Sequence, residues 1–121
     1  MKRGRGRIIN IVSVLGLVVV PLVGAYCAAK GGVIQLTRAL AVEWARYQIT
    51  VNALAPGYFI SPMNQQAFAN PEVLQNTIRR VPLKRLAEYD DLTPVVVFLA
   101  SDASKYITGQ VVVVDGGWTI L

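Results

Sequence analysis

The chain has 121 residues, which suits one domain with a core but not two. Its composition, 54% hydrophobic and 16% charged, excludes a disordered polymer and favours elements buried on both faces, as in a parallel sheet covered by helices. There is no histidine and only one cysteine, Cys27, which excludes Ser-His-Asp and Cys-His catalytic sites and an ordinary zinc site. Cys27 cannot form an internal disulfide, so we expect a reducing, cytoplasmic location and a small apolar helix residue at this position.

The net charge of +5 is concentrated at the start of the chain. Four cations fall in a short terminal arm, Lys2, Arg3, Arg5 and Arg7, and the remainder has eight Lys and Arg against seven Asp and Glu. A nucleic-acid surface needs basic residues spread over a face, so we expect no nucleic-acid partner.

Residues 8–29 carry no charge and follow a basic start, as in a signal peptide or membrane anchor. Their number also suits one membrane-spanning helix. A membrane-anchored or secreted chain using residues 8–29 is therefore one alternative. Polar residues, Gly and Pro interrupt the run, however, which favours a buried strand over Ile8–Val12 followed by a loop, and we expect no membrane partner.

A long helix is predicted from about Ala25 to Tyr47. Its apolar stripe recurs at spacings of three and four and is expected to face the core; its members are Val33, Leu36, Thr37, Leu40 and Trp44. Ile49–Ala55 reads as a second strand ended by Pro56 and Gly57. Strand, helix and strand form a βαβ unit, whose two strands should be parallel.

The second half of the chain is predicted to hold a functional loop, two helices and a last strand. Tyr58–Asn70 is the loop, and Pro71–Arg80 is a helix capped by Asn70. Another helix should begin at Asp90 or Asp91 and run to about Leu99, and Val111–Val114 is an apolar strand. The fold class is therefore α/β, in the order β-α-β-α-α-β with at least three parallel strands.

Open parallel sheets bind ligands at the carboxyl ends of their strands. Ser13, the Pro56-Gly57 loop and Asp115 each follow a predicted strand, so we expect a site at that edge.

Tyr26 and Lys30 lie four residues apart, which places them on one face of a helix. An ammonium about 4 Å from a phenolate contributes on the order of 4 kcal/mol at an effective dielectric near 20, comparable to the cost of ionising a phenol at neutral pH. The pair therefore suits proton transfer, with the Ser13 hydroxyl holding a substrate oxygen. A buried tyrosine beside a surface lysine is the alternative interpretation of the same spacing.

Several further segments occur in a fixed order with this pair. They are GRIINIVS at Gly6–Ser13, YCAAK at Tyr26–Lys30, VNALAPG at Val51–Gly57, FLASD at Phe98–Asp102, ITGQ at Ile107–Gln110 and VDGG at Val114–Gly117. Together they resemble the short-chain dehydrogenase/reductase family over essentially the whole chain. The resemblance implies the C-terminal half of a Rossmann-like doubly wound parallel sheet. Residues 1–121 would be a single partial domain, the catalytic and substrate-loop half.

The resemblance implies an NAD- or NADP-dependent oxidoreductase that transfers a hydride between the cofactor and a secondary alcohol or ketone, without a metal. Tyr26 would act as general acid/base, Ser13 would hydrogen-bond the same substrate oxygen, and Lys30 would assist Tyr26 and bind the nicotinamide ribose. The loop would hold the nicotinamide through Pro56, Gly57, Phe59 and Ser61. Within the family, the sequence most resembles those of gluconate-type sugar-acid dehydrogenases. Gln65 and Gln66 would then be contacts to a polyol substrate, or else solvated loop residues.

The family's N-terminal nucleotide-binding half, with its Gly-rich phosphate turn, is not found in this sequence. A catalytically incompetent fragment or association module is therefore a second alternative. The resemblance also implies a homo-oligomer formed through the long helix and through the last helix and strand.

Overall fold

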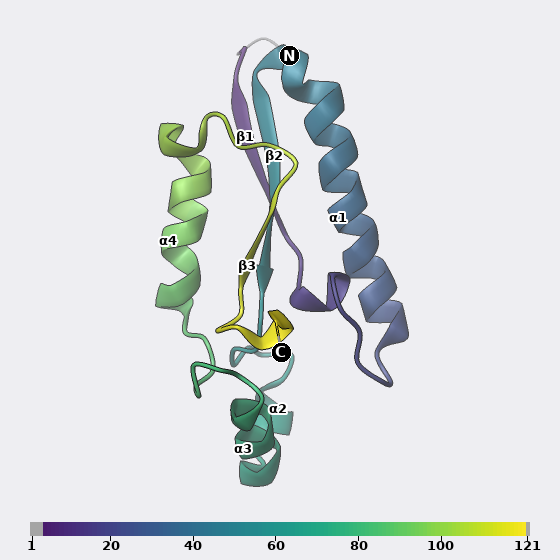
Figure 1. Ribbon diagram of the computed structural model, residues 1–121, viewed down its shortest axis with the longest axis vertical. Helices are drawn as coiled ribbons and strands as arrows, with labels where there is room; N and C mark the ends of the chain where they lie inside the picture. Colours follow the sequence, from purple (N-terminus) through teal and green to yellow (C-terminus); the bar gives the residue numbers. More distant parts are fainter. Residues whose placement is uncertain (1–3, 121) are drawn as a thin grey trace.

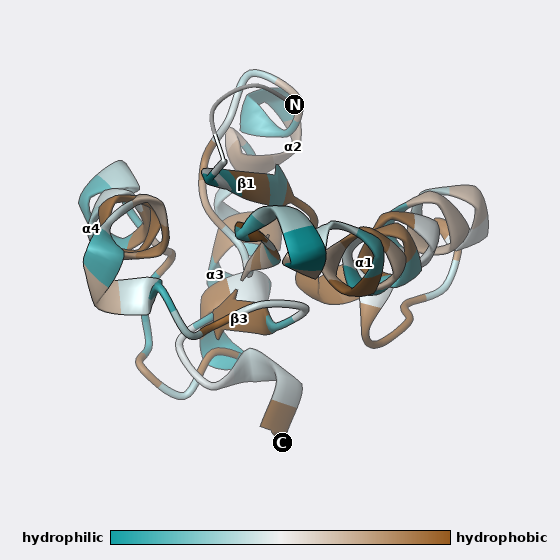
Figure 2. Cartoon of the chain, turned by 90° about the horizontal axis from the view of Figure 1, so that it is seen from above, coloured by the Kyte–Doolittle hydropathy of each residue, from teal (hydrophilic) through white to brown (hydrophobic). Residues whose placement is uncertain are grey.

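The computed structural model describes residues 4–120 of the chain. Within this range the strands β1 (Gly6–Ile11), β2 (Ile49–Pro56) and β3 (Val111–Val114) form a parallel sheet in the order β1-β2-β3. The long helix α1 (Gly24–Trp44) and the helix α4 (Tyr89–Ala100) cover opposite faces of this sheet (Figures 1 and 2). The predicted α/β class and the parallel sheet are confirmed.

Two shorter helices lie beyond the carboxyl end of the sheet, α2 (Gln65–Phe68) and α3 (Pro71–Arg79) (Figure 1). The Asn70 side chain accepts a hydrogen bond of 2.9 Å from the Glu72 backbone N–H, so it caps α3 as predicted. The short helix α2 and a final turn at Trp118–Ile120 were not predicted, because neither is long enough to show a period in the sequence.

The central strand β2 is the buried element of the fold. Val51, Ala53, Leu54 and Ala55 are at most 1% exposed, because both faces of the strand are covered and both edges are paired. Most of its residues are apolar, as such a strand requires, and the buried Asn52 amide is satisfied by the Ile107 carbonyl and the Gln110 N–H.

The core-facing stripe of α1 was partly mispredicted. The buried positions of the helix are Cys27, Ile34, Thr37 and Ala41, whereas Leu36 is 51% exposed. Small side chains allow the helix to approach the sheet closely. Thr37 fits there because its hydroxyl accepts from the Asn10 amide (2.9 Å) and donates to the Val33 carbonyl (2.8 Å).

The uncharged run of residues 8–29 is divided among strand β1, a loop and the first turns of α1. Between residues 4 and 120, no helix has both the length and the apolar character needed to cross a bilayer. The basic start is also not a separate arm, because Arg7 lies in β1 and pairs with Asp102 (3.1 Å). Lys2 and Arg3 lie outside the described residues.

The carboxyl ends of β2 and β3 meet at Gly57 and Asp115. The Gly57 N–H donates to the Val114 carbonyl (2.9 Å), and a Cβ on Gly57 would lie 2.7 Å from the Asp115 Cα. The Asp115 carboxylate accepts from the Gly117 N–H, the Thr119 N–H and the Thr119 hydroxyl, at 2.7–2.8 Å. Asp115 therefore holds the turn that follows β3.

These contacts make stability depend on pH. Burial alone would raise the pKa of Asp115, but the hydrogen bonds from Thr119 and Gly117 outweigh it and leave this pKa below its ordinary value. The ionised form is therefore favoured by folding. Its contribution is fully present above the unfolded pKa of about 3.9 and is lost as the pH falls through the lower folded pKa.

We expect Asp115→Asn to lower the free energy of unfolding by about 1–3 kcal/mol at pH 7, because three part-buried donors lose a charged acceptor. The difference between wild type and variant should shrink as the pH falls below about 4. Urea unfolding at a series of pH values measures both quantities, with Glu43→Gln on the exposed face of α1 as the control. A difference that stays constant between pH 7 and pH 3 would contradict this role.

Candidate active site

A cavity of about 470 Å³ lies at the carboxyl ends of β1 and β2. All the residues predicted for catalysis and for cofactor binding line it, namely Ser13, Tyr26, Lys30, Pro56, Gly57, Phe59 and Ser61. They come from three separate parts of the chain, and the fold brings every one of them to this place.

Ser13 follows β1 and caps a short turn, Val14–Gly16. Its backbone is extended (φ −162°, ψ 155°), and its Oγ accepts a hydrogen bond of 3.1 Å from the Leu15 N–H. This bond fixes the oxygen and leaves the hydroxyl proton free to turn toward the cavity.

Tyr26 and Lys30 lie in the first two turns of α1 and share a face, as their spacing predicts. The Lys30 Nζ lies 5.6 Å from the centre of the Tyr26 ring. It donates a hydrogen bond of 3.2 Å to the carbonyl of Ile11, the last residue of β1. The ammonium thus joins the end of the strand to the face of the helix that carries the phenol.

The close approach of the Ser13 turn to α1 depends on Gly16. A Cβ at this position would lie 2.8 Å from the Lys30 carbonyl carbon and 2.9 Å from the Ile34 side chain. A Cβ at Gly31 would lie 3.5 Å from the Gly16 oxygen, an ordinary contact, so an alanine would fit there. Gly16 alone therefore sets the separation of the Ser13 turn from the helix.

The loop after β2 is organised by Asn64, a residue that the sequence analysis did not single out. Its side-chain amide donates to the Phe59 carbonyl (2.9 Å), and its Oδ1 accepts from the Ser61 N–H (2.8 Å). Asn64 also lines the cavity. Asparagine tolerates many loop roles, so its identity alone gave no signal.

A cluster of three aromatic side chains anchors the same loop to the C-terminal turn. The Tyr58 ring contacts the rings of Trp118 and Phe68 edge to face, with centroids 5.2 Å and 6.4 Å apart. Burial raises the pKa of the Tyr58 phenol, and the charge of Arg80 partly offsets this. Tyr58 is therefore a neutral packing residue at neutral pH.

Two other predicted features lie outside the cavity. Gln65 and Gln66 are exposed on α2 and do not line it, so the described chain places them with the solvated residues. Asp115 lies at the carboxyl end of β3, as predicted, but its carboxylate is used within its own turn.

Lys30 is the only charged residue among those that line the cavity, whose walls are mostly apolar. An ammonium in such surroundings acts on a neighbouring oxygen more strongly than it would in water. No group of three or more His, Cys, Asp and Glu with metal-binding geometry occurs within residues 4–120.

Gly16→Ala is expected to destabilise the chain by about 1–3 kcal/mol, because the added methyl group meets helix backbone that cannot move aside. The amide resonances of Ser13 and Lys30 should shift with it. Gly24→Ala is the matched control, since a Cβ at Gly24 meets nothing within 4 Å. Equal stability of the two variants, with unchanged resonances at Ser13, would show that this contact does not position the site.

Comparison with known proteins places this geometry in a family. A sequence profile described as enoyl-(acyl carrier protein) reductase matches residues 1–119. The gluconate 5-dehydrogenase of Gluconobacter oxydans is 41% identical over 118 residues, which are 98% of this chain and 46% of that protein. The 2-dehydro-3-deoxy-D-gluconate 5-dehydrogenase of Bacillus subtilis is 45% identical over 119 residues, which are 98% of this chain and 46% of that protein.

A solved structure gives the same result. The gluconate 5-dehydrogenase of Burkholderia cenocepacia, in complex with NADP and tartrate, superimposes with a TM-score of 0.95 at 40% identity, covering 98% of this chain and 47% of that one. The chain therefore spans about half the length of the relatives it matches. With its parallel sheet and its profile match, this chain belongs to the short-chain dehydrogenase/reductase family.

Proposed function

We propose that the chain is the catalytic and substrate-loop half of an NAD(P)-dependent oxidoreductase that interconverts a secondary alcohol and a ketone. The observation that carries this proposal is the single cavity that collects Ser13, Tyr26 and Lys30. The names of the relatives support the reaction class, since they are sugar-acid and polyol dehydrogenases.

In the proposed reaction Tyr26 exchanges a proton with the substrate oxygen. The Lys30 ammonium, held by the Ile11 carbonyl, places a positive charge 5.6 Å from the centre of the Tyr26 ring and would assist this proton transfer. Ser13, whose oxygen is fixed by the Leu15 N–H, donates a hydrogen bond to the same substrate oxygen and keeps it within reach of Tyr26.

The cavity also fits a nicotinamide ring. Its apolar walls suit a flat ring, and the backbone from Pro56 to Phe59 and the Ser61 hydroxyl supply polar groups at one side. A bound nicotinamide would supply or accept the hydride. We propose that Pro56, Gly57, Phe59 and Ser61 hold the ring and that Lys30 contacts its ribose, with no preference between NAD and NADP.

The substrate class has two candidates. The names of the relatives favour a sugar acid. The residues that line the cavity favour a substrate with an apolar face, because Lys30 is the only charged residue among them. Exposed apolar side chains also occur on the loops beside the cavity: Val19, Leu22 and Met63 are 80%, 103% and 81% exposed. Rates with gluconate and with cyclohexanol separate these candidates.

We further propose that this oxidoreductase is a homo-oligomer located in the cytoplasm. Exposed apolar residues occur on α1, α4 and β3, the elements expected at its interfaces: Leu36, Val42, Val97, Phe98 and Val113. Surface of this kind favours association. The alternative role, as an association module without catalysis, uses the same residues but not Tyr26.

Tyr26→Phe tests the proposed chemistry most cleanly in a chimera. This chain replaces the aligned segment of the Gluconobacter gluconate 5-dehydrogenase, and turnover of gluconate and cyclohexanol is followed by NADPH or NADH absorbance. We expect the substitution to reduce kcat by at least about 100-fold, the usual contribution of a general acid/base, while cofactor affinity is retained.

Tyr47→Phe is the control, because Tyr47 is an exposed phenol outside the cavity. Unchanged turnover in the Tyr26→Phe chimera would contradict the assignment. An inactive but folded chimera that still binds cofactor would favour the association module.

A further inference from the structure

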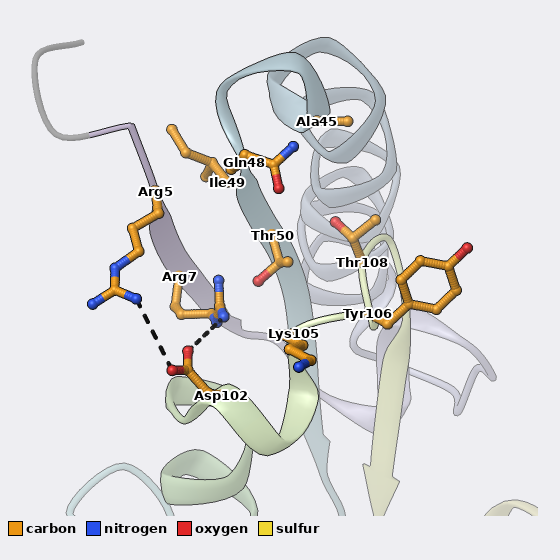
Figure 3. A pocket seen from close by; sticks show the side chains of 10 residues that line it. All are labelled: Arg5, Arg7, Ala45, Gln48, Ile49, Thr50, Asp102, Lys105, Tyr106 and Thr108. Carbon is orange, nitrogen blue, oxygen red and sulfur yellow. Dashed lines mark hydrogen bonds and ion pairs between the residues drawn. The ribbon is translucent and has the colours of Figure 1, made fainter.

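A second cavity, of about 620 Å³, lies at the opposite end of the sheet from the candidate active site. It is formed by the start of β1, the turn between α1 and β2, and the segment that follows α4 (Figure 3). The proposed reaction uses none of these residues.

Cations outnumber anions in this cavity. Arg5, Arg7 and Lys105 line it, and Asp102 is the one carboxylate among the lining residues. Arg7 is engaged, since it donates to Asp102 (3.1 Å) and to backbone carbonyls. Arg5 lies 4.0 Å from Asp102 with its side chain 78% exposed. Both arginines thus share one carboxylate, and the three cations of the lining exceed it by two positive charges.

Thr50 supplies an unpaired buried group in the same place. The residue is 8% exposed, and its Oγ1 is buried with no hydrogen-bond partner among residues 4–120. Thr50 is the register partner of Arg7 across β1 and β2, and its hydroxyl points to the side where Arg7 lies (Figure 3). An unpaired buried hydroxyl is unfavourable, and a ligand oxygen placed here would give it a partner.

Apolar side chains line the cavity as well. Ile49 lies on the same side as Arg5, whereas Tyr106, a fully exposed residue (100%), lies across the cavity from it (Figure 3). Figure 3 shows Arg5 and Arg7 at one side and the Tyr106 ring at the other, with Thr50 and Lys105 between them. The cavity therefore has a cationic end at Arg5 and Arg7 and an aromatic end at Tyr106.

We propose that this cavity binds a small organic anion. A carboxylate or phosphate group lies beside Thr50, between Arg5 on one side and Lys105 on the other. An aromatic body extends from there toward Tyr106. An inorganic anion would leave the aromatic end uncovered, and a neutral aromatic molecule would leave the excess positive charge unbalanced.

The test is an NMR titration of the isotope-labelled 121-residue chain with four probes. Phenyl phosphate and benzoate carry both groups, inorganic phosphate carries only the anion, and phenol carries only the ring. We expect saturable shifts at Arg5, Thr50 and Tyr106 with the first two probes. Inorganic phosphate and phenol should bind at least about tenfold more weakly, since each forfeits one end of the cavity. The tighter of phenyl phosphate and benzoate identifies the anion.

Two variants make the test specific. Arg5→Gln combined with Lys105→Gln should weaken binding of the tighter probe about tenfold, whereas Arg38→Gln combined with Arg79→Gln, with the same loss of charge elsewhere, should not. Thr50→Val should leave the free chain as stable as wild type or more stable, because an unpaired hydroxyl is removed, and should weaken binding.

Several outcomes would overturn the proposal. They are the absence of saturable shifts at Arg5, Thr50 and Tyr106, equal binding by the two double variants, and equal affinity for inorganic phosphate and phenyl phosphate. None of these results bears on Tyr26 or the active-site cavity, so this proposal and the proposed function fail separately.

Discussion

The hydrogen bond from the Lys30 ammonium to the Ile11 carbonyl is the contact on which the proposed site depends. It ties the last residue of the edge strand β1 to the first turns of the long helix, and it is possible because Gly16 lets the intervening turn lie against the helix backbone. Ser13 and Tyr26 come from the two elements joined in this way. The separation of hydroxyl, phenol and ammonium is therefore set by backbone packing, which is more rigid than the side chains themselves.

The same sheet presents different chemistry at its two ends. The carboxyl end holds a mostly apolar cavity with one charge, Lys30, where a single ammonium has a strong local effect. The amino end holds Arg5, Arg7 and Lys105 near Asp102. Arg5 and Asp102 are exposed there, so water screens their charges and several charges are needed for recognition. Parallel strands separate these ends by the length of β2, so each can be altered without disturbing the other.

Much of the fold could be predicted because local signals and burial agree. The strand β2 is mostly apolar and β-branched in its first half and is ended by Pro56 and Gly57, and Asn70 before Pro71 specifies the start of α3. The predicted site residues were found from the Tyr26–Lys30 spacing together with the family resemblance. The exposure of Leu36, the Arg7–Asp102 pair across 95 residues and the loop contacts of Asn64 were not predictable. They depend on which surfaces meet after folding, which periodicity and residue type do not encode.

The central claim is that the cavity beside Tyr26 receives the nicotinamide. The most direct measurement is an NMR titration of the 121-residue chain with NADH and with NADPH. We expect saturable shifts at Ser13, Tyr26 and Gly57 that are greatly reduced by Lys30→Met, which removes the ammonium and its bond to Ile11. A folded sample whose Ser13, Tyr26 and Gly57 resonances do not respond to either cofactor would contradict this claim.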